Sequence, residues 1–253
     1  MADPASAGRS DGRSTAPAFY ALRSGGWRDY WTLLHPPYTV WHLSYVVLGA
    51  CVAPRLDLGW LAETLAAFLL AMGVAAHALD ELHGRPLGTR IPSGVLVGLA
   101  VLGLVGAVGL GVHGAIEVSP WIWAFIAAGV FLVPAYNLEW FGGAVHSDLW
   151  FALAWGAFPA LTAGFAQAGR LTPAIAVVAA GCTAMSAAQR VLSTPVRRLR
   201  RTIVGVEGVM RRDDGDEEPL DAATLRAAPE GALRLLSLAV PLLAAGLLIA
   251  RLS

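Results

Sequence analysis

Seven long apolar blocks are the feature that most limits what this chain can fold into. A helix needs about 20 apolar residues to cross a bilayer, and inside the hydrocarbon every backbone polar group must be bonded within the protein. The blocks lie at roughly 38–54, 60–80, 94–113, 119–138, 148–167, 173–192 and 232–251. They predict an all-α integral membrane bundle of about seven transmembrane helices.

Composition supports the same class. The chain is 56% hydrophobic and only 14% charged, whereas soluble domains are about 25% charged. Its formal net charge is +0, so overall charge gives no indication of a nucleic-acid partner. Membrane lipid is the expected surrounding.

The arginines predict an orientation. All 18 basic residues fall on one side of the seven-span arrangement except Arg55, Arg170 and Arg251. Basic residues collect on the cytoplasmic side of membrane proteins. We therefore expect a multi-pass protein of the cell inner (cytoplasmic) membrane, N-in and C-out. Residues 1–26 are expected to form a disordered cytoplasmic tail, and residues 27–253 a single transmembrane domain with a cytoplasmic loop at 193–231.

The first polar cluster ends the second apolar block, in the stretch AAHALDELHGRPLGTRIPSG. His77, Asp80 and Glu81 share one helical stripe, because residues three and four apart face the same way. Carboxylates suit Mg²⁺, and an added imidazole shifts the preference towards Mn²⁺, Fe²⁺ or Zn²⁺. The stripe predicts a metal site; the alternative is an ion-paired anchor, with Arg85, at the helix end.

Two further clusters fall at the same predicted side. Around the turn between the fourth and fifth blocks stand Tyr136, Asn137, Glu139 and His146. Gln189 and Arg190 interrupt the sixth block, and Arg197 follows it. An arginine at this place can bind a diphosphate or a carboxylate. As plainer alternatives, Glu139 is a loop residue and Arg190 extends to the membrane interface.

These stretches together resemble the UbiA superfamily of intramembrane prenyltransferases. HALDELHGRPLGTRIPSG resembles the Asp-rich motif and Arg-Pro-Leu loop that close the family's second helix. AYNLEWFGGAVHSDLWFALAWGAFPALTAG resembles the family's middle signature, and Ser193-Thr194-Pro195-Val196 resembles a stretch after its sixth helix. The chain departs from the family where His77 replaces an aspartate and where Cys182 and Ser186 fall at the aspartates of the second Asp-rich motif.

The resemblance implies an enzyme that acts on an isoprenoid diphosphate, by prenyl transfer or by cyclisation as in the family's terpene-cyclase branch. A metal-bound diphosphate would lie in a cavity on the cytoplasmic side, with Mg²⁺ as the expected cofactor. The implied catalytic residues are Asp80, Glu81, Tyr136 and Asn137, and the implied substrate-binding residues are Arg85, Arg90, Gln189, Arg190, Arg197, Glu139 and His146. Two alternatives stay open: a non-catalytic membrane protein that binds lipid or assists a partner, and a different metalloenzyme that uses the His/Asp/Glu cluster.

Overall fold

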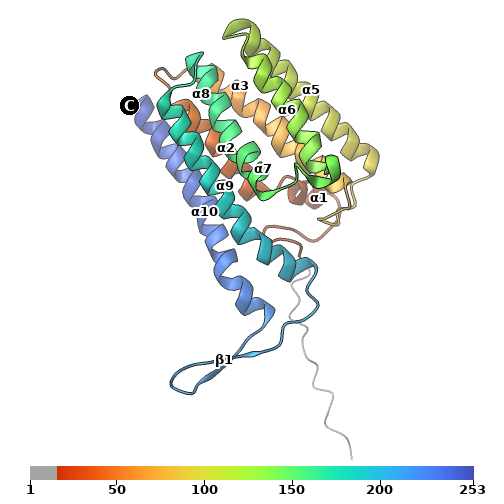
Figure 1. The fold of residues 1–253 in the computed structure, drawn as a ribbon. Helices are drawn as coiled ribbons and strands as arrows, with labels where there is room; N and C mark the ends of the chain where they lie inside the picture. Colours follow the sequence, from red (N-terminus) through yellow and green to blue (C-terminus); the bar gives the residue numbers. More distant parts are fainter. Residues whose placement is uncertain (1–15) are drawn as a thin grey trace, which may run out of the picture.

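A computed structural model describes residues 16–253 and consists mainly of helices. Figure 1 shows them running alongside one another as a bundle, with a small hairpin projecting beyond one end. The helices and strands, in chain order, are α1 (Trp27–Leu33), α2 (Pro36–Cys51), α3 (Leu58–Phe68), η1 (Leu69–Ala76), α4 (His77–Leu82), α5 (Ser93–Glu117), α6 (Ile122–Asn137), η2 (Phe141–Gly143), α7 (Asp148–Ala152), η3 (Leu153–Ala157), α8 (Phe158–Ala168), α9 (Pro173–Arg201), β1 (Val209–Arg211), β2 (Glu217–Pro219) and α10 (Ala222–Leu252).

The chain has the helices of a multi-pass membrane protein. Five are long and apolar enough to cross a bilayer: Leu58–Leu82, Ser93–Glu117, Asp148–Ala168, Pro173–Arg201 and Ala222–Leu252. Ile122–Asn137 is apolar but shorter, and α2 has 16 residues. Each predicted apolar block overlaps one of these helices. That all seven cross the membrane, N-terminus inside, stays a prediction.

The outer faces of the bundle are apolar. Leu102 on α5, Val177 on α9 and Leu243 on α10 are 72%, 71% and 69% exposed. Soluble proteins rarely expose such surfaces over several neighbouring helices, whereas lipid tails solvate them at no cost. Hydrocarbon is therefore the solvent that fits these faces.

The centre of the bundle is α2, which packs most extensively against α8 and α10. Trp41 and Tyr45 of α2 are fully buried, and the Trp41 Nε1–H donates to the Tyr45 hydroxyl at 2.6 Å. One turn further, Gly49 lies against the backbone of Ala160 on α8. Small residues at such crossings let two helix backbones approach closely.

Two membrane helices each contain a π-helical segment. η1 joins α3 to α4 within Leu58–Leu82, and η3 joins α7 to α8 within Asp148–Ala168. A π-helical turn accommodates an extra residue, and such turns often occur at functional sites. Here they precede or contain residues that line the main cavity described below.

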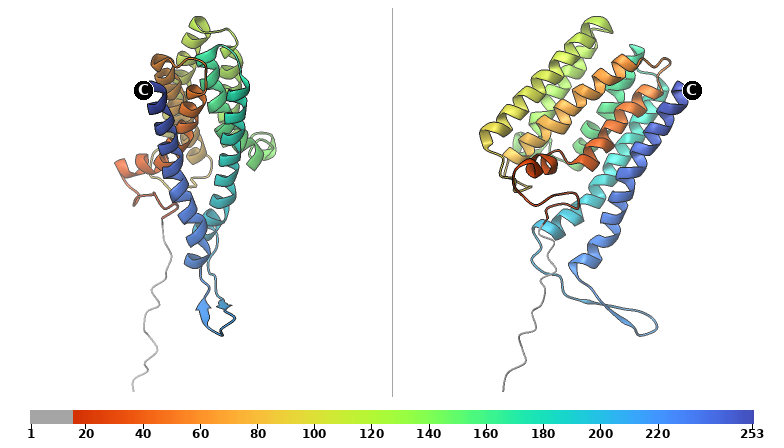
Figure 2. Two further views of the ribbon diagram at one scale, coloured as in Figure 1. Left: turned by 90° about the vertical axis from the view of Figure 1, so that its left-hand side faces the viewer. Right: turned by 180° about the vertical axis from the view of Figure 1, so that it is seen from behind.

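The cytoplasmic loop expected at 193–231 is shorter than predicted. α9 continues to Arg201, through Pro195, and α10 begins at Ala222. Pro195 removes one backbone donor without ending the helix, and the Arg-rich turns beyond it remain helical. Between the helices, β1 and β2 form an antiparallel hairpin that pairs Val209 with Pro219 (Figure 2).

The expected disordered tail at 1–26 is partly wrong. Residues 16–26 lie against the bundle, where Asp29 of α1 accepts a hydrogen bond from Gly25 N at 2.8 Å. Leu22 N donates to the Thr32 hydroxyl at 3.1 Å. The aromatic pair Phe19 and Tyr20 provides the apolar surface that fixes this segment. The rest of the predicted tail, residues 1–15, lies outside the described residues.

Candidate functional site

A cavity of about 150 Å³ opens at the end of the bundle where the polar clusters lie. Its walls come from α2, η1, α4, α6, α7, η3, α9 and α10, and the N-terminal segment covers part of its mouth. Of the residues expected to form the site, the cavity brings together His77, Asp80, Tyr136, Asn137, His146, Gln189, Arg190 and Arg197. Three clusters far apart in sequence therefore meet at one place.

Glu81 is a correction, because it does not face this cavity. Its side chain is fully buried, 0% exposed, on the other side of α4. The carboxylate accepts hydrogen bonds from Leu87 N at 2.9 Å and from Thr89 N at 2.8 Å, and a third from the Thr89 hydroxyl at 2.9 Å. Glu81 therefore holds the loop after α4 in place, and its acceptor capacity is used there.

Arg85 also belongs to that loop and not to the cavity. Its guanidinium donates to Ile91 O at 2.6 Å and to the Ser93 hydroxyl at 2.8 Å. Arg90 and Glu139 are exposed and do not line the cavity either. The predicted substrate-binding roles of these three residues do not fit their positions.

An arginine wall, formed by Arg190, Arg197 and Arg201, is the main charge feature of the cavity. These residues are spaced i, i+7 and i+11 along α9, so they lie on one helical face. Arg190 donates from Nε to the exposed Asp148 carboxylate at 2.7 Å and lies over the Phe151 ring at 5.2 Å. Among residues 16–253, neither Arg197 nor Arg201 has an ion-pair partner.

Asp80 faces the arginine wall as the one carboxylate among the described residues that line the cavity. No hydrogen bond or ion pair ties this carboxylate to another residue in the described part of the chain. Asp148 pairs with Arg190, and Arg197 and Arg201 against the single Asp80 still leave the cavity positive. An anionic ligand is the species that such a cavity attracts.

Three cavity histidines are held in the same way. The Nδ1 atoms of His35, His77 and His146 lie 2.7, 3.0 and 2.9 Å from the backbone oxygens of Leu33, Gly73 and Tyr136. A carbonyl can only accept, so each Nδ1 carries a proton. The His35 and His77 rings lie 4.3 Å apart, and His146 stacks on Tyr136 at 4.4 Å.

Three further polar atoms at the cavity are buried without a well-formed hydrogen bond within residues 16–253, although the side chains of His42 and Gln189 interact with each other. The three atoms are His42 Nε2, the Tyr136 hydroxyl and Gln189 Oε1. A buried polar atom without a hydrogen bond costs about 1–3 kcal/mol. Their common location suggests that water or a ligand satisfies them when the site is filled.

A three-residue metal site is not formed by the predicted side chains. Across the described range, no three His, Cys, Asp or Glu side chains gather as metal ligands would, since Glu81 points away from His77 and Asp80. A Mg²⁺ ion that arrives on a diphosphate needs only one or two protein carboxylates. Asp80 fits that lesser role.

Neither a protein-family model, nor a curated protein, nor a solved structure matches the chain.

Sequence reasoning missed several cavity residues. His35, Tyr38 and His42 could have been found from the sequence, because their i, i+3, i+7 spacing places them on one helix face. Arg201 continues the face of Arg190 and Arg197 and could have been found in the same way. Phe19 and Tyr20 lie in the short apolar run APAFYAL at 16–22, but so short a run does not predict where it docks.

Proposed function

We infer that this protein is a membrane enzyme that binds an isoprenoid diphosphate and ionises it. The observation that carries this proposal is the arginine wall on α9, which faces Asp80 and His77 across one cavity at the end of a membrane bundle. The UbiA-like resemblance adds the substrate class and the cytoplasmic sidedness. Prenyl transfer to an acceptor and cyclisation are both compatible with such a site.

The headgroup would lie against the arginine wall. A guanidinium presents a planar fork of donors that matches phosphate oxygens and keeps its charge at every relevant pH. Arg197 and Arg201 have no carboxylate partner within the described chain, so their charge is available to a ligand. Arg190, oriented by Asp148 and Phe151, would complete the set.

Ionisation breaks the bond between the allylic carbon and the diphosphate oxygen, and the electron pair leaves with that oxygen. Positive groups placed where this negative charge develops lower the barrier. Asp80 would help to hold a Mg²⁺ ion, which would supply Lewis-acid stabilisation of the leaving group.

The allylic cation left behind requires a wall that attracts positive charge without reacting. Tyr136, Phe151 and Trp155 line the cavity, and the Tyr136 and Trp155 rings lie edge to face at 5.7 Å. Aromatic faces stabilise cations by about 0.5–2 kcal/mol each. Asn137 is buried beside Tyr136 and donates to Val133 O at 2.7 Å, which fixes this end of α6.

The runner-up is a non-catalytic protein that binds an anionic lipid headgroup in the same cavity. It is favoured by the single carboxylate, which offers little to a two-metal mechanism. The metalloenzyme alternative has less support, because Glu81 and Glu139 do not reach the cavity that holds His77, Asp80 and His146.

Pyrophosphate release from C10 to C20 prenyl diphosphates, with Mg²⁺ or Mn²⁺, tests the proposal on purified protein. We expect release by the native chain, strong loss in Asp80→Asn and Arg197→Gln, and no loss in Arg198→Gln, an exposed arginine one position away that does not line the cavity. Tight binding of prenyl diphosphate without release would favour the lipid-binding function. If the protein neither binds prenyl diphosphate nor releases pyrophosphate, both functions are rejected.

A further inference from the structure

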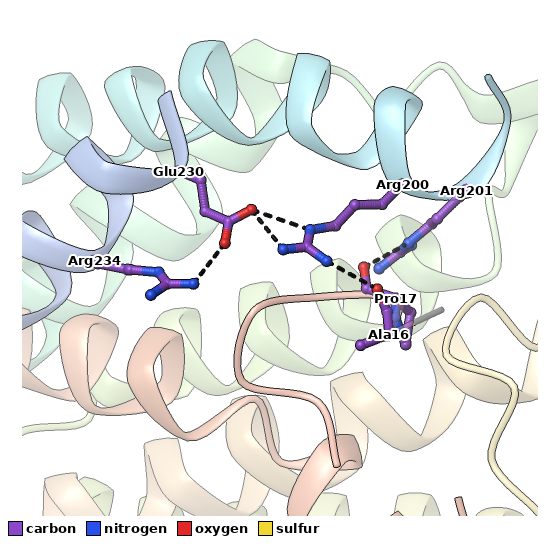
Figure 3. A network of polar contacts seen from close by, with 6 residues as sticks. All are labelled: Ala16, Pro17, Arg200, Arg201, Glu230 and Arg234. Carbon is purple, nitrogen blue, oxygen red and sulfur yellow. Dashed lines mark hydrogen bonds and ion pairs between the residues drawn. The ribbon is translucent and has the colours of Figure 1, made fainter. Parts of the chain in front are cut away.

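The N-terminal segment 16–20 lies across the mouth of the cavity and is held there by two arginines of α9. Arg200 donates from Nη1 to Ala16 O at 3.2 Å, and Arg201 donates from Nε to Pro17 O at 3.3 Å (Figure 3). Residues 17–20 line the cavity together with Arg201. Arg201 therefore contacts both the segment and the space where a headgroup would bind.

The holding arginine Arg200 is itself fixed by a buried ion pair. Its Nη2 lies 2.6 Å from Glu230 Oε2 on α10, and the two side chains are 5% and 8% exposed. Glu230 also accepts from Arg234 at 2.7 Å, and Arg234 lies 5.1 Å from the Phe19 ring centre. Figure 3 shows Glu230 between the two arginines, with Arg200 reaching on to the N-terminal segment. The segment thus docks on a surface that the ion pairs of Glu230 hold in place.

Aromatic contacts complete the docking of the segment. The Phe19 ring lies 6.1 Å from Tyr38, and the Tyr20 ring lies 5.5 Å from Tyr38 and 5.4 Å from His35. Burial, with a smaller contribution from Tyr38, raises the pKa of Tyr20 well above its ordinary value, so its phenol stays neutral. The segment covers part of the mouth with uncharged rings and carries no acidic residue over positions 16–20.

With the segment in place, the cavity is partly covered and is small for a whole prenyl diphosphate. It holds about 150 Å³, whereas pockets for drug-sized ligands hold roughly 300–1,000 Å³. The other walls are packed membrane helices. The N-terminal segment is held by backbone carbonyls and ring edges, so it is the wall that moves at least cost.

We propose that residues 16–20 form a lid that a diphosphate headgroup releases by competing with Pro17 O for Arg201. A phosphate oxygen carries charge and a carbonyl oxygen does not, so the guanidinium prefers the phosphate. Breaking this contact frees the lid at the point where it crosses the mouth. This inference shares the headgroup site with the proposed function but requires no catalysis.

The test measures how fast a water-soluble maleimide modifies single cysteines in otherwise native protein. Cys51 and Cys182, the two buried native cysteines, are replaced by alanine. Ser193→Cys reports on the cavity, Ala18→Cys reports on the lid, and Ser119→Cys, at the other end of the bundle, controls for reagent and detergent. The added probes are inorganic pyrophosphate and farnesyl diphosphate, with sodium chloride at matched ionic strength.

Two results are expected. Phe19→Ala combined with Tyr20→Ala speeds modification of Ser193→Cys on the order of tenfold, because lost ring contacts shift the lid towards the open state. Pyrophosphate speeds modification of Ala18→Cys but not of Ser119→Cys. Sodium chloride speeds modification of neither cysteine. In Arg201→Gln, modification of Ala18→Cys is fast without any probe.

The proposal is overturned if the double variant leaves Ser193→Cys modification unchanged, because the segment then does not cover the cavity. It is also overturned if pyrophosphate slows or does not alter Ala18→Cys modification. A protein that passes both tests but releases no pyrophosphate from prenyl diphosphates keeps the lid and loses the proposed catalysis, so the two failures are distinguishable.

Discussion

Asp80 and Glu81 are neighbours in sequence and face opposite environments. Asp80 points into the cavity without a hydrogen-bonding partner in the described chain, whereas Glu81 is fully buried and accepts three hydrogen bonds from the loop that follows. Successive residues on a helix are rotated by about 100°, so an acidic pair on one helix divides readily between two tasks. The chemistry of α4 therefore depends on Asp80 and the stability of the next loop on Glu81.

This division predicts opposite effects for two conservative substitutions. Asp80→Asn should lower pyrophosphate release about 100-fold or more, because the charged group opposite the leaving group is lost, and should leave the thermal unfolding midpoint nearly unchanged. Glu81→Gln should lower the midpoint, because an amide cannot accept all three hydrogen bonds and a mispaired buried group costs about 1–3 kcal/mol. Activity and thermal scans in the same detergent test both; equal midpoints for the two variants would contradict the division.

The arginine wall predicts graded loss of anion binding. Arg197→Gln and Arg201→Gln should each weaken pyrophosphate binding by roughly 10- to 100-fold, since a hydrogen bond to a charged group contributes about 1.5–3 kcal/mol. Arg198→Gln, the neighbouring exposed arginine, should bind as the native chain does. Titration calorimetry at two salt concentrations measures this. If Arg198→Gln loses as much affinity as Arg197→Gln, general surface charge explains the binding and the wall does not.

The crossing of α2 and α8 predicts a stability effect far from the site. A Cβ atom on Gly49 would lie 2.1 Å from Ala160 O, so Gly49→Ala must push the two helices apart. Such overpacking costs about 1–3 kcal/mol or more. Gly98→Ala is the matched control, because its added methyl meets nothing within 4 Å. Gly49→Ala should unfold at a lower temperature than the native protein, and Gly98→Ala at an equal or higher one.

His35, which lies before the first residue of α2, predicts a pH dependence of stability. Burial, the neighbouring His77 ring and the charges of Arg197 and Arg201 lower its pKa well below 6.5, although a hydrogen bond to Leu33 O opposes the shift. The unfolded chain binds a proton more readily there, so this contribution to stability is present above pH 6.5 and is lost as pH falls below it.

The thermal unfolding midpoint should therefore decrease as the pH is lowered from about 6.5 to 5. His35→Asn, which keeps a residue tolerant of the positive φ of 46° at this position, should show a flatter profile. A profile equally steep in the variant would place the titrating group elsewhere.

The membrane-helix architecture followed from the sequence because hydrophobic length is a strong local signal. The candidate site could be predicted from the sequence only in part. Periodicity places Asp80, Arg190 and Arg197 on defined helix faces, and those residues do reach the cavity. The loop residues Arg85 and Glu139 could not be placed, because positive φ angles of 54° and 51° redirect the chain there and spacing carries no information about them. Docking of the N-terminal segment was equally hidden, because it depends on partners about 180 residues away.

The π-helical segment η1 has a consequence for how this chain should be aligned with others. It ends at Ala76, directly before His77 and Asp80. If this segment became a regular α-helix while keeping all of its residues, everything after that point would turn by about 100° relative to Leu58–Phe68. His77 and Asp80 would then leave the cavity while every motif letter stayed the same. An alignment that matches the letters without a one-residue gap at 69–76 would therefore equate side chains that point in different directions.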